Sequence, residues 1–246
     1  MIFKFLSKPL VLHCIVSEEF SHVYDYAPVQ PANLFFPQWW RQLAKSRVDW
    51  TAGNLTQNIK SCQGIQDHYA HGAVIPMWTE MSVSMNGQGG VTNQFSDMIT
   101  TNDYQGPDFR GGIHYNRINM KIATPWRMMS DRDVYWHFLP VYWDLAEPEP
   151  WEVCPGTLEF YYQHSVNVNL MIDNVAGSIN IQHLQPLVHL VPLSERRLKI
   201  KNEMVSAGEF NRLANRTRAL SFLNKYKTIR RVVRDQDSKS CPFSWL

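Results

Sequence analysis

Short apolar segments separated by turn residues follow one another between residues 72 and 192, and this spacing constrains the fold more than any other feature. Apolar and polar residues alternate within several segments, as they do in strands with one buried face. No long helical repeat lies between them, which favours antiparallel strands over β-α-β units. We therefore predict a mainly β fold, an antiparallel β-sandwich or jelly-roll-like domain, with strands at 10–16, 73–85, 118–122, 134–143, 156–162, 166–172, 178–181 and 187–191.

The remaining segments complete the predicted organisation of the chain. Hydrophobic residues make up 44% of the 246 residues, enough for a sizeable core. A short helix is expected at 37–45, because proline is favoured in a first turn, and its Trp39-Trp40 pair would anchor it by packing. The dipeptide Asn86-Gly87 predicts a hairpin turn. We divide the chain into a β-rich core domain, residues 1–200, and a basic helix with a C-terminal arm, residues 201–246.

The C-terminal segment predicts an amphipathic basic helix. Ser206 and Glu209 form a capping box, and apolar residues follow at helical spacing. The helix should end before Arg230, and a polar linker then leads to an aromatic tail. Exposed aromatic side chains need a surface that covers them, either on the body or on another subunit. The residues that we expect to bind a partner are Arg212, Arg216, Lys227, Arg230, Arg231, Phe243 and Trp245.

The charges are distributed unevenly along the chain. Residues 1–195 hold 11 lysines and arginines against 18 aspartates and glutamates, a balance of −7, whereas residues 196–246 hold 13 against 4, a balance of +9. An acidic body with a basic arm predicts that the arm docks on an acidic protein surface, its own or a neighbouring copy's, or on nucleic acid.

Several histidines are candidate metal ligands. His68 and His71 stand at i and i+3, so they would share one face of a helical turn, and His114 or His137 would complete the set from the sheet. The strand-borne His-x-Asp/Glu pair of iron oxygenases is missing, since Asn116 stands two residues after His114. A divalent metal is therefore the alternative to a protein that has no cofactor and no catalytic residues.

Other chemical signals are weak. Cys154-Pro155-Gly156 follows several glutamates and is interpreted as a turn, not as a nucleophile. No apolar run approaches the ~18 residues of a membrane span, and no secretion signal is recognised. The four cysteines are far apart and contain no CxxC pair, which is typical of reduced thiols in a cytosolic protein.

A series of aromatic, proline and glycine motifs runs along most of the chain: 26–33 (YAPVQPAN), 36–40 (FPQWW), 59–64 (IKSCQG), 72–78 (GAVIPMW), 121–126 (KIATPW), 154–156 (CPG), 186–192 (PLVHLVP) and 240–243 (SCPF). Together these motifs resemble an uncharacterised family of tailed-bacteriophage proteins, best represented in phages of marine cyanobacteria. The chain departs from the family pattern at 143–151, where it has an acidic loop. The resemblance implies viral origin and a β-rich fold, and it carries over no catalytic residue.

Three functional hypotheses follow. The first is a non-enzymatic phage structural protein, in the virion or the host cytoplasm, whose arm docks on other copies of the chain or on other virion proteins. The second is a metal-dependent jelly-roll enzyme of the cupin type that uses the histidines. The third is an intracellular viral effector that binds nucleic acid through the basic arm.

Overall fold

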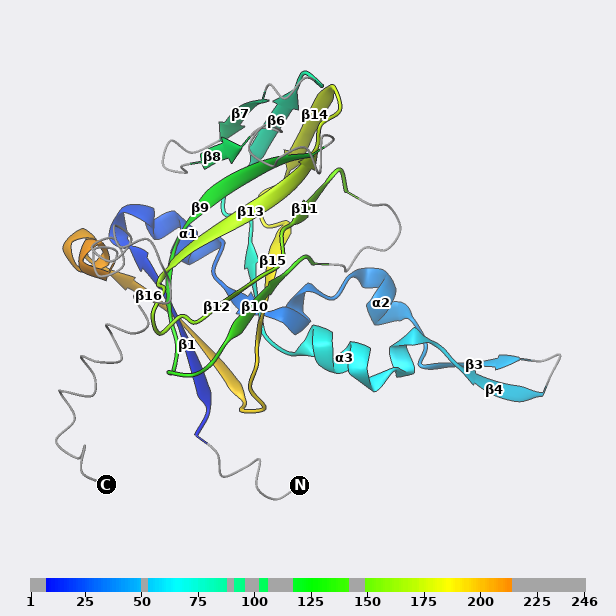
Figure 1. The fold of residues 1–246 in the computed structure, drawn as a ribbon. Helices are drawn as coiled ribbons and strands as arrows, with labels where there is room; N and C mark the ends of the chain where they lie inside the picture. The colour runs from blue at the N-terminus through cyan, green and yellow to red at the C-terminus, as the bar shows by residue number, and fades with distance from the viewer. Residues whose placement is uncertain are drawn as a thin grey trace.

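The computed structural model describes residues 8–49, 53–87, 91–95, 102–105, 117–141 and 149–213. These residues form a mainly β protein with several antiparallel sheets, consistent with a β-sandwich, so the predicted fold class is confirmed. Within this part of the chain there are two large sheets, two small ones and several short helices (Figure 1).

The first large sheet has six strands, with β11, β13, β9, β1 and β16 side by side and β8 paired with β9. In chain order the strands are β1 (Leu10–Ser17), β8 (Asn102–Gln105), β9 (Arg117–Met129), β11 (Trp151–Val153), β13 (Ser165–Asp173) and β16 (Leu198–Val205). Buried and half-buried residues alternate along the whole of β13. At β13 the sheet therefore has one face in the core and one face toward solvent.

One pair of strands in this sheet is parallel. β1 and β16 run in the same direction, from Leu10 opposite Leu198 to Ser17 opposite Val205. Parallel neighbours need a long connection, and here nearly the whole body lies between them in sequence. The antiparallel prediction did not include this pair, nor β16 as a strand. Because β16 runs across residue 200, where we divided the chain, the β-rich body extends to Val205.

The second large sheet has the order β12-β10-β15-β5-β2. Its strands are β2 (Gln30–Pro31), β5 (Ala73–Pro76), β10 (Trp136–Leu139), β12 (Gly156–Leu158) and β15 (Pro186–Pro192). All four residues of β5 are buried, because both faces of this strand are covered.

Two small sheets complete the β structure. One pairs β14 (Gly177–Ile181), β6 (Met81–Met85) and β7 (Val91–Phe95), and the other pairs β3 (Ser46–Asp49) with β4 (Asn54–Gln57). The single strand predicted over 73–85 was wrong, since β5 and β6 belong to different sheets. The chain leaves the second sheet after Pro76, which cannot donate a backbone hydrogen bond. The hairpin predicted at Asn86-Gly87 is formed by β6 and β7, which pair antiparallel, and Gly87 has the positive φ, 75°, that favours glycine.

The helices described as far as residue 205 are all short. They are η2 (Glu18–Phe20), α1 (Ser21–Tyr26), η3 (Ala32–Phe35), α2 (Gln38–Gln42), η4 (Ile59–Ser61) and α3 (Gln63–Ala70). The helix predicted within 37–45 is confirmed as α2, with Pro37 directly before it. In Figure 1, α2 and α3 lie between the second sheet and the β3–β4 hairpin.

The main core lies between the inner faces of the two large sheets. Its largest fully buried side chains include Trp126 from the first sheet, Trp136 from the second and Phe160 from the segment after β12. The rings of Trp136 and Phe160 are 5.5 Å apart. Burial of this apolar surface is the main source of stability for such a body.

A second, smaller apolar cluster covers the outer face of the second sheet. Val74 of β5 is fully buried there, against aromatic side chains that include Phe36 and Tyr69. Trp40 of α2 stacks on Phe36 at 5.7 Å and meets Tyr69 of α3 edge-on at 5.9 Å. The predicted packing role of the tryptophan pair is thus confirmed for Trp40, whereas Trp39 is 38% exposed.

Candidate functional site

The first turns of the C-terminal helix are described, at residues 207–213, and we call residues 206–213 the arm root. The Ser206 Oγ accepts a hydrogen bond from the backbone N–H of Glu209 at 3.4 Å, and the Phe210 N–H donates to the Ser206 carbonyl at 3.0 Å. A serine that caps the N–H three residues later is the expected start of a helix. The capping prediction at Ser206 is therefore confirmed.

Phe210 anchors the arm root on the body. Its side chain is only 7% exposed, and its ring lies 6.4 Å from the ring of Phe20 in an edge-on arrangement. The Arg127 guanidinium lies over the Phe210 ring, 4.8 Å from its centre. The backbone N–H of Ala207 donates to Glu18 at 3.4 Å, so a carboxylate also lies at the positive end of the helix. The arm thus leaves the body from a fixed position.

Most of the predicted partner-binding residues of the arm lie beyond residue 213, where the described part of the chain ends. Arg212 is the one predicted partner-binding residue within the described range, where its side chain is 79% exposed and 3.6 Å from Glu209. An exposed ion pair of this kind contributes little to stability. Because most of its side chain is exposed, Arg212 is accessible to a partner. The predictions for Arg216, Lys227, Arg230, Arg231, Phe243 and Trp245 fall outside the described residues and stay predictions.

Strand β16 leads directly into the arm root and adds to its positive charge. It is at the edge of the first sheet, with Lys199 and Lys201 exposed. Glu203, two residues further on, accepts a hydrogen bond from His13 Nδ1 of β1 at 2.9 Å. The basic character that the sequence predicts for the arm therefore begins on an exposed strand of the body.

The predicted histidine set is only partly brought together. His68 lies on α3, but His71 follows the helix in an extended conformation, with φ −97° and ψ 137°. The predicted helical turn therefore ends before His71, and the two histidines do not both lie within the helix. His137 lies on β10, where its Nδ1 is 2.9 Å from Thr157 Oγ1, and His114 falls outside the described residues.

A histidine that the sequence analysis missed lies beside His68. The ring of His189 on β15 is 5.2 Å from that of His68, and its Nε2–H donates to the His71 carbonyl at 2.7 Å. Burial lowers the pKa of His189 to about 4 and also lowers the pKa of His68. The sequence could have indicated this residue, because it is the only histidine within the apolar run 186–192 and a histidine in such a strand is often buried and neutral.

Metal ligation gains no geometric support in the part of the chain that is described. Within it, no three side chains of the ligating types His, Cys, Asp and Glu lie close enough to hold a metal ion. The carboxylate of Asp67, which precedes His68, accepts a hydrogen bond from Gln63 of its own helix at 2.7 Å.

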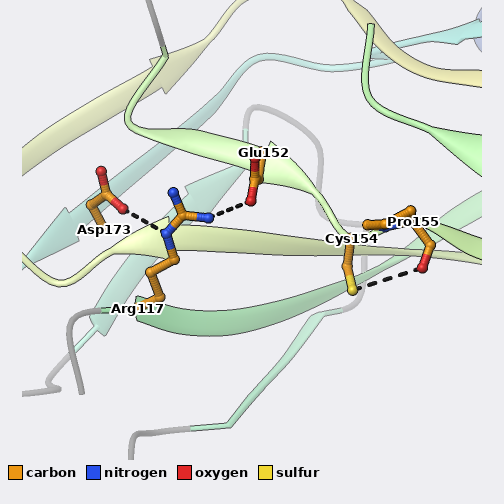
Figure 2. Close-up of polar contacts among 5 residues, drawn as sticks. All are labelled: Arg117, Glu152, Cys154, Pro155 and Asp173. Atoms are coloured by element: carbon orange, nitrogen blue, oxygen red, sulfur yellow. Dashed lines mark hydrogen bonds and ion pairs between the residues drawn. The ribbon is translucent and has the colours of Figure 1, made fainter. Parts of the chain in front are cut away.

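A charged group lies at the far end of the first sheet, on its outer face. Figure 2 shows Arg117 of β9 between Asp173 of β13 and Glu152 of β11. The Arg117 Nε is 3.0 Å from Asp173, and a terminal nitrogen of the same guanidinium bonds Glu152. These contacts, led by the hydrogen bond with Glu152, raise the pKa of Arg117. Three charges from three strands are thus satisfied by one another.

Cys154 lies near this group but is not part of it. It is exposed, and its Sγ lies 3.9 Å from the carbonyl of the next residue, Pro155. Figure 2 shows the Glu152 carboxylate directed to Arg117 and away from this thiol. Cys154 and Pro155 connect β11 to β12, as the turn interpretation expected.

A hollow of about 290 Å³ lies where the edge strands of the two large sheets, β16 and β2, come near each other. We call it the edge hollow. It is lined by residues from β16, from β2 and its extension, and from the end of α3: Pro31, Asn33, Ala70, His71, Gly72, Arg197, Leu198 and Ile200.

Comparisons with protein-family models, with curated proteins and with solved structures found no match for this chain. Among the described residues, no helix is long and apolar enough to cross a membrane.

Proposed function

We propose that this protein is a phage-encoded, non-enzymatic structural protein that assembles with copies of itself or with other virion proteins through its basic arm, residues 206–246. The observation that carries the proposal is the anchored arm root. Because Phe210 is buried against Phe20 and Arg127, the arm starts from one place on the body. A partner bound further along the arm is then tethered to one place on the body.

The charge distribution supports a partner that resembles the body. The arm belongs to the region with a balance of +9, and the body has a balance of −7. Opposite charges accelerate the encounter of two copies and disfavour association of arm with arm. Buried aromatic side chains carry much of the binding energy in protein interfaces, which gives Phe243 and Trp245 the role of anchors.

The proposed viral origin rests on the sequence resemblance, and the described motif residues have roles that suit a structural family. Gly72 has φ 98°, and a Cβ at this position would clash with the Leu190 carbonyl oxygen, so only glycine fits there. Trp78 and Trp126 are buried in the main core. These motifs serve turns and packing, a role that suits an assembly component in the virion or in the host cytoplasm.

The test is the molar mass of the purified full-length protein, measured by size-exclusion chromatography with light scattering. We expect a defined oligomer, and we expect deletion of residues 230–246 to give a monomer whose circular dichroism spectrum is unchanged. An oligomer that persists after the deletion, or a full-length protein that is already monomeric and binds no virion protein, contradicts the proposal.

Two double variants distinguish the aromatic from the electrostatic contribution. Phe243→Ser with Trp245→Ser removes the anchors and keeps the charge, whereas Arg230→Gln with Arg231→Gln removes charge and keeps the anchors. We expect the first to dissociate the oligomer at all salt concentrations and the second to weaken it mainly at low salt.

Nucleic-acid binding is a second candidate, and β16 favours it. Lys199 and Lys201 are exposed on the strand that leads into the arm root, so the basic surface extends from the arm onto the body. Titration with a DNA oligonucleotide at several salt concentrations tests this candidate. An affinity that falls steeply with salt supports it, and an affinity that does not change between low and physiological salt excludes it.

A further inference from the structure

The edge hollow carries a site of its own, separate from the arm. We infer that it binds a small organic anion, a phosphate or carboxylate group attached to an apolar or aromatic stem. The inference rests on the arginine that lines the hollow, on the apolar wall beside it and on the contacts that fix the rim.

The positive charge at the hollow is not neutralised within the described part of the chain. Arg197 has no ion pair there, whereas its neighbour Arg196 bonds Asp131 at 2.7 Å. The imidazole of His71 likewise has no hydrogen-bond partner among the described residues, and no aspartate or glutamate lines the hollow. A guanidinium presents a planar set of donors that matches a carboxylate or phosphate with two parallel hydrogen bonds.

The other lining residues indicate what is attached to the anion. Pro31, Leu198 and Ile200 contribute apolar surface, and Asn33 contributes an amide that can donate or accept. A volume of about 290 Å³ is just below the range for small-molecule sites, about 300–1,000 Å³. A single ring or a short chain with one anionic group fits these dimensions and this mixture of surfaces.

The rim of the hollow is held by buried contacts. The His71 carbonyl accepts the hydrogen bond from His189, and Gly72 lies so close to Leu190 that a larger residue cannot replace it. On the other side, the Asn202 amide of β16 donates to the Val29 carbonyl at 3.0 Å and joins the two sheet edges. A site whose walls are fixed before binding loses little conformational entropy when a ligand enters.

The experiment is isothermal titration of the full-length protein with phenyl phosphate, which combines a ring with an anionic group, and with inorganic phosphate. We expect saturable binding at one site per chain, tighter for phenyl phosphate. Arg197→Gln should weaken this binding about tenfold to a hundredfold, the effect of losing charge-assisted hydrogen bonds. The matched control is Lys199→Gln, which removes an exposed charge two residues away and should change the affinity less than about twofold.

A steric variant locates the site. Ala70 is exposed at the end of α3 and lines the hollow, so Ala70→Phe fills it without changing any charge. We expect Ala70→Phe to abolish binding while the circular dichroism spectrum stays unchanged. Three results overturn the inference: no saturable binding at millimolar phenyl phosphate, equal losses in Arg197→Gln and Lys199→Gln, or full binding in Ala70→Phe. Because none of the lining residues belongs to residues 230–246, anion binding and assembly are tested by separate variants, and the inference and the assembly proposal succeed or fail independently.

Discussion

The outer faces of the two large sheets differ in what covers them. On the first sheet the outward residues of β13 are polar or half-exposed, and Arg117, Glu152 and Asp173 neutralise one another at the surface. On the second sheet the outer face is buried under α3 and its neighbours, where Val74 and His189 are at most 1% exposed. Along β13 the first sheet therefore buries one apolar face, whereas along β5 the second sheet buries both of its faces.

The same difference is visible in the strand sequences. β13 reads Ser-Val-Asn-Val-Asn-Leu-Met-Ile-Asp, a near-complete alternation, and β5 reads Ala-Val-Ile-Pro without any polar residue. Alternation is typical of a strand with one wet face, and a continuous apolar run is typical of a strand buried on both sides.

A lysine introduced on the outer face of each large sheet should give the largest difference in stability between the two sheets. Val74→Lys places a charge in the covered cluster, and we expect it to lower the free energy of unfolding by about 3–5 kcal/mol, the cost of an uncompensated buried charge. Asn167→Lys is the matched control on the open face of β13, and its effect should stay within about 0.5 kcal/mol. Chemical denaturation of both variants measures the difference, and equal effects would mean that the α3 layer does not seal the second sheet.

The covered face should also make stability depend on pH, through His189. Its pKa is about 4 in the folded protein and about 6.5 when unfolded, so the unfolded chain binds more protons between these values. The free energy of unfolding should therefore fall as the pH is lowered from about 6.5 to about 4, by about 3 kcal/mol in total. His68, whose pKa is also lowered, acts in the same direction, and His71 lies close to His189.

The control for this pH dependence is His189→Gln. Glutamine keeps an N–H donor for the His71 carbonyl but does not titrate, so stability measured between pH 7 and pH 4 should lose most of its slope. A variant with the wild-type slope would show that His189 is not the group responsible.

Much of the fold was predictable because strand alternation is local information. The predicted segments at 10–16, 166–172, 178–181 and 187–191 match β1, β13, β14 and β15 closely. β16 was missed because its lysines and glutamate interrupt the apolar pattern that is typical of a strand. Its partner β1 is also separated from it in sequence by nearly the whole body. Pairing over such a distance leaves no local pattern.

The candidate site was predictable to a similar extent and for the same reason. The helix start at Ser206 depends on residues three positions apart, and it was found. The contact of His68 with His189 and the meeting of Arg197 with His71 at the edge hollow join segments more than 100 residues apart. Only the assembled sheets bring them together.

The smallest expected effect concerns the ion pairs on the open face. Arg117→Gln removes both pairs and leaves Glu152 and Asp173 facing each other, yet all three side chains are more than one-third exposed. Exposed pairs contribute about 0.2–1 kcal/mol each, so the variant should lose about 1 kcal/mol of unfolding free energy at low salt and less at high salt. Denaturant titrations at two salt concentrations measure this. If the loss is several kcal/mol and independent of salt, the Arg117 group stabilises the open face by more than screened surface charges. The outer faces of the two sheets would then differ only in the α3 layer that covers the second.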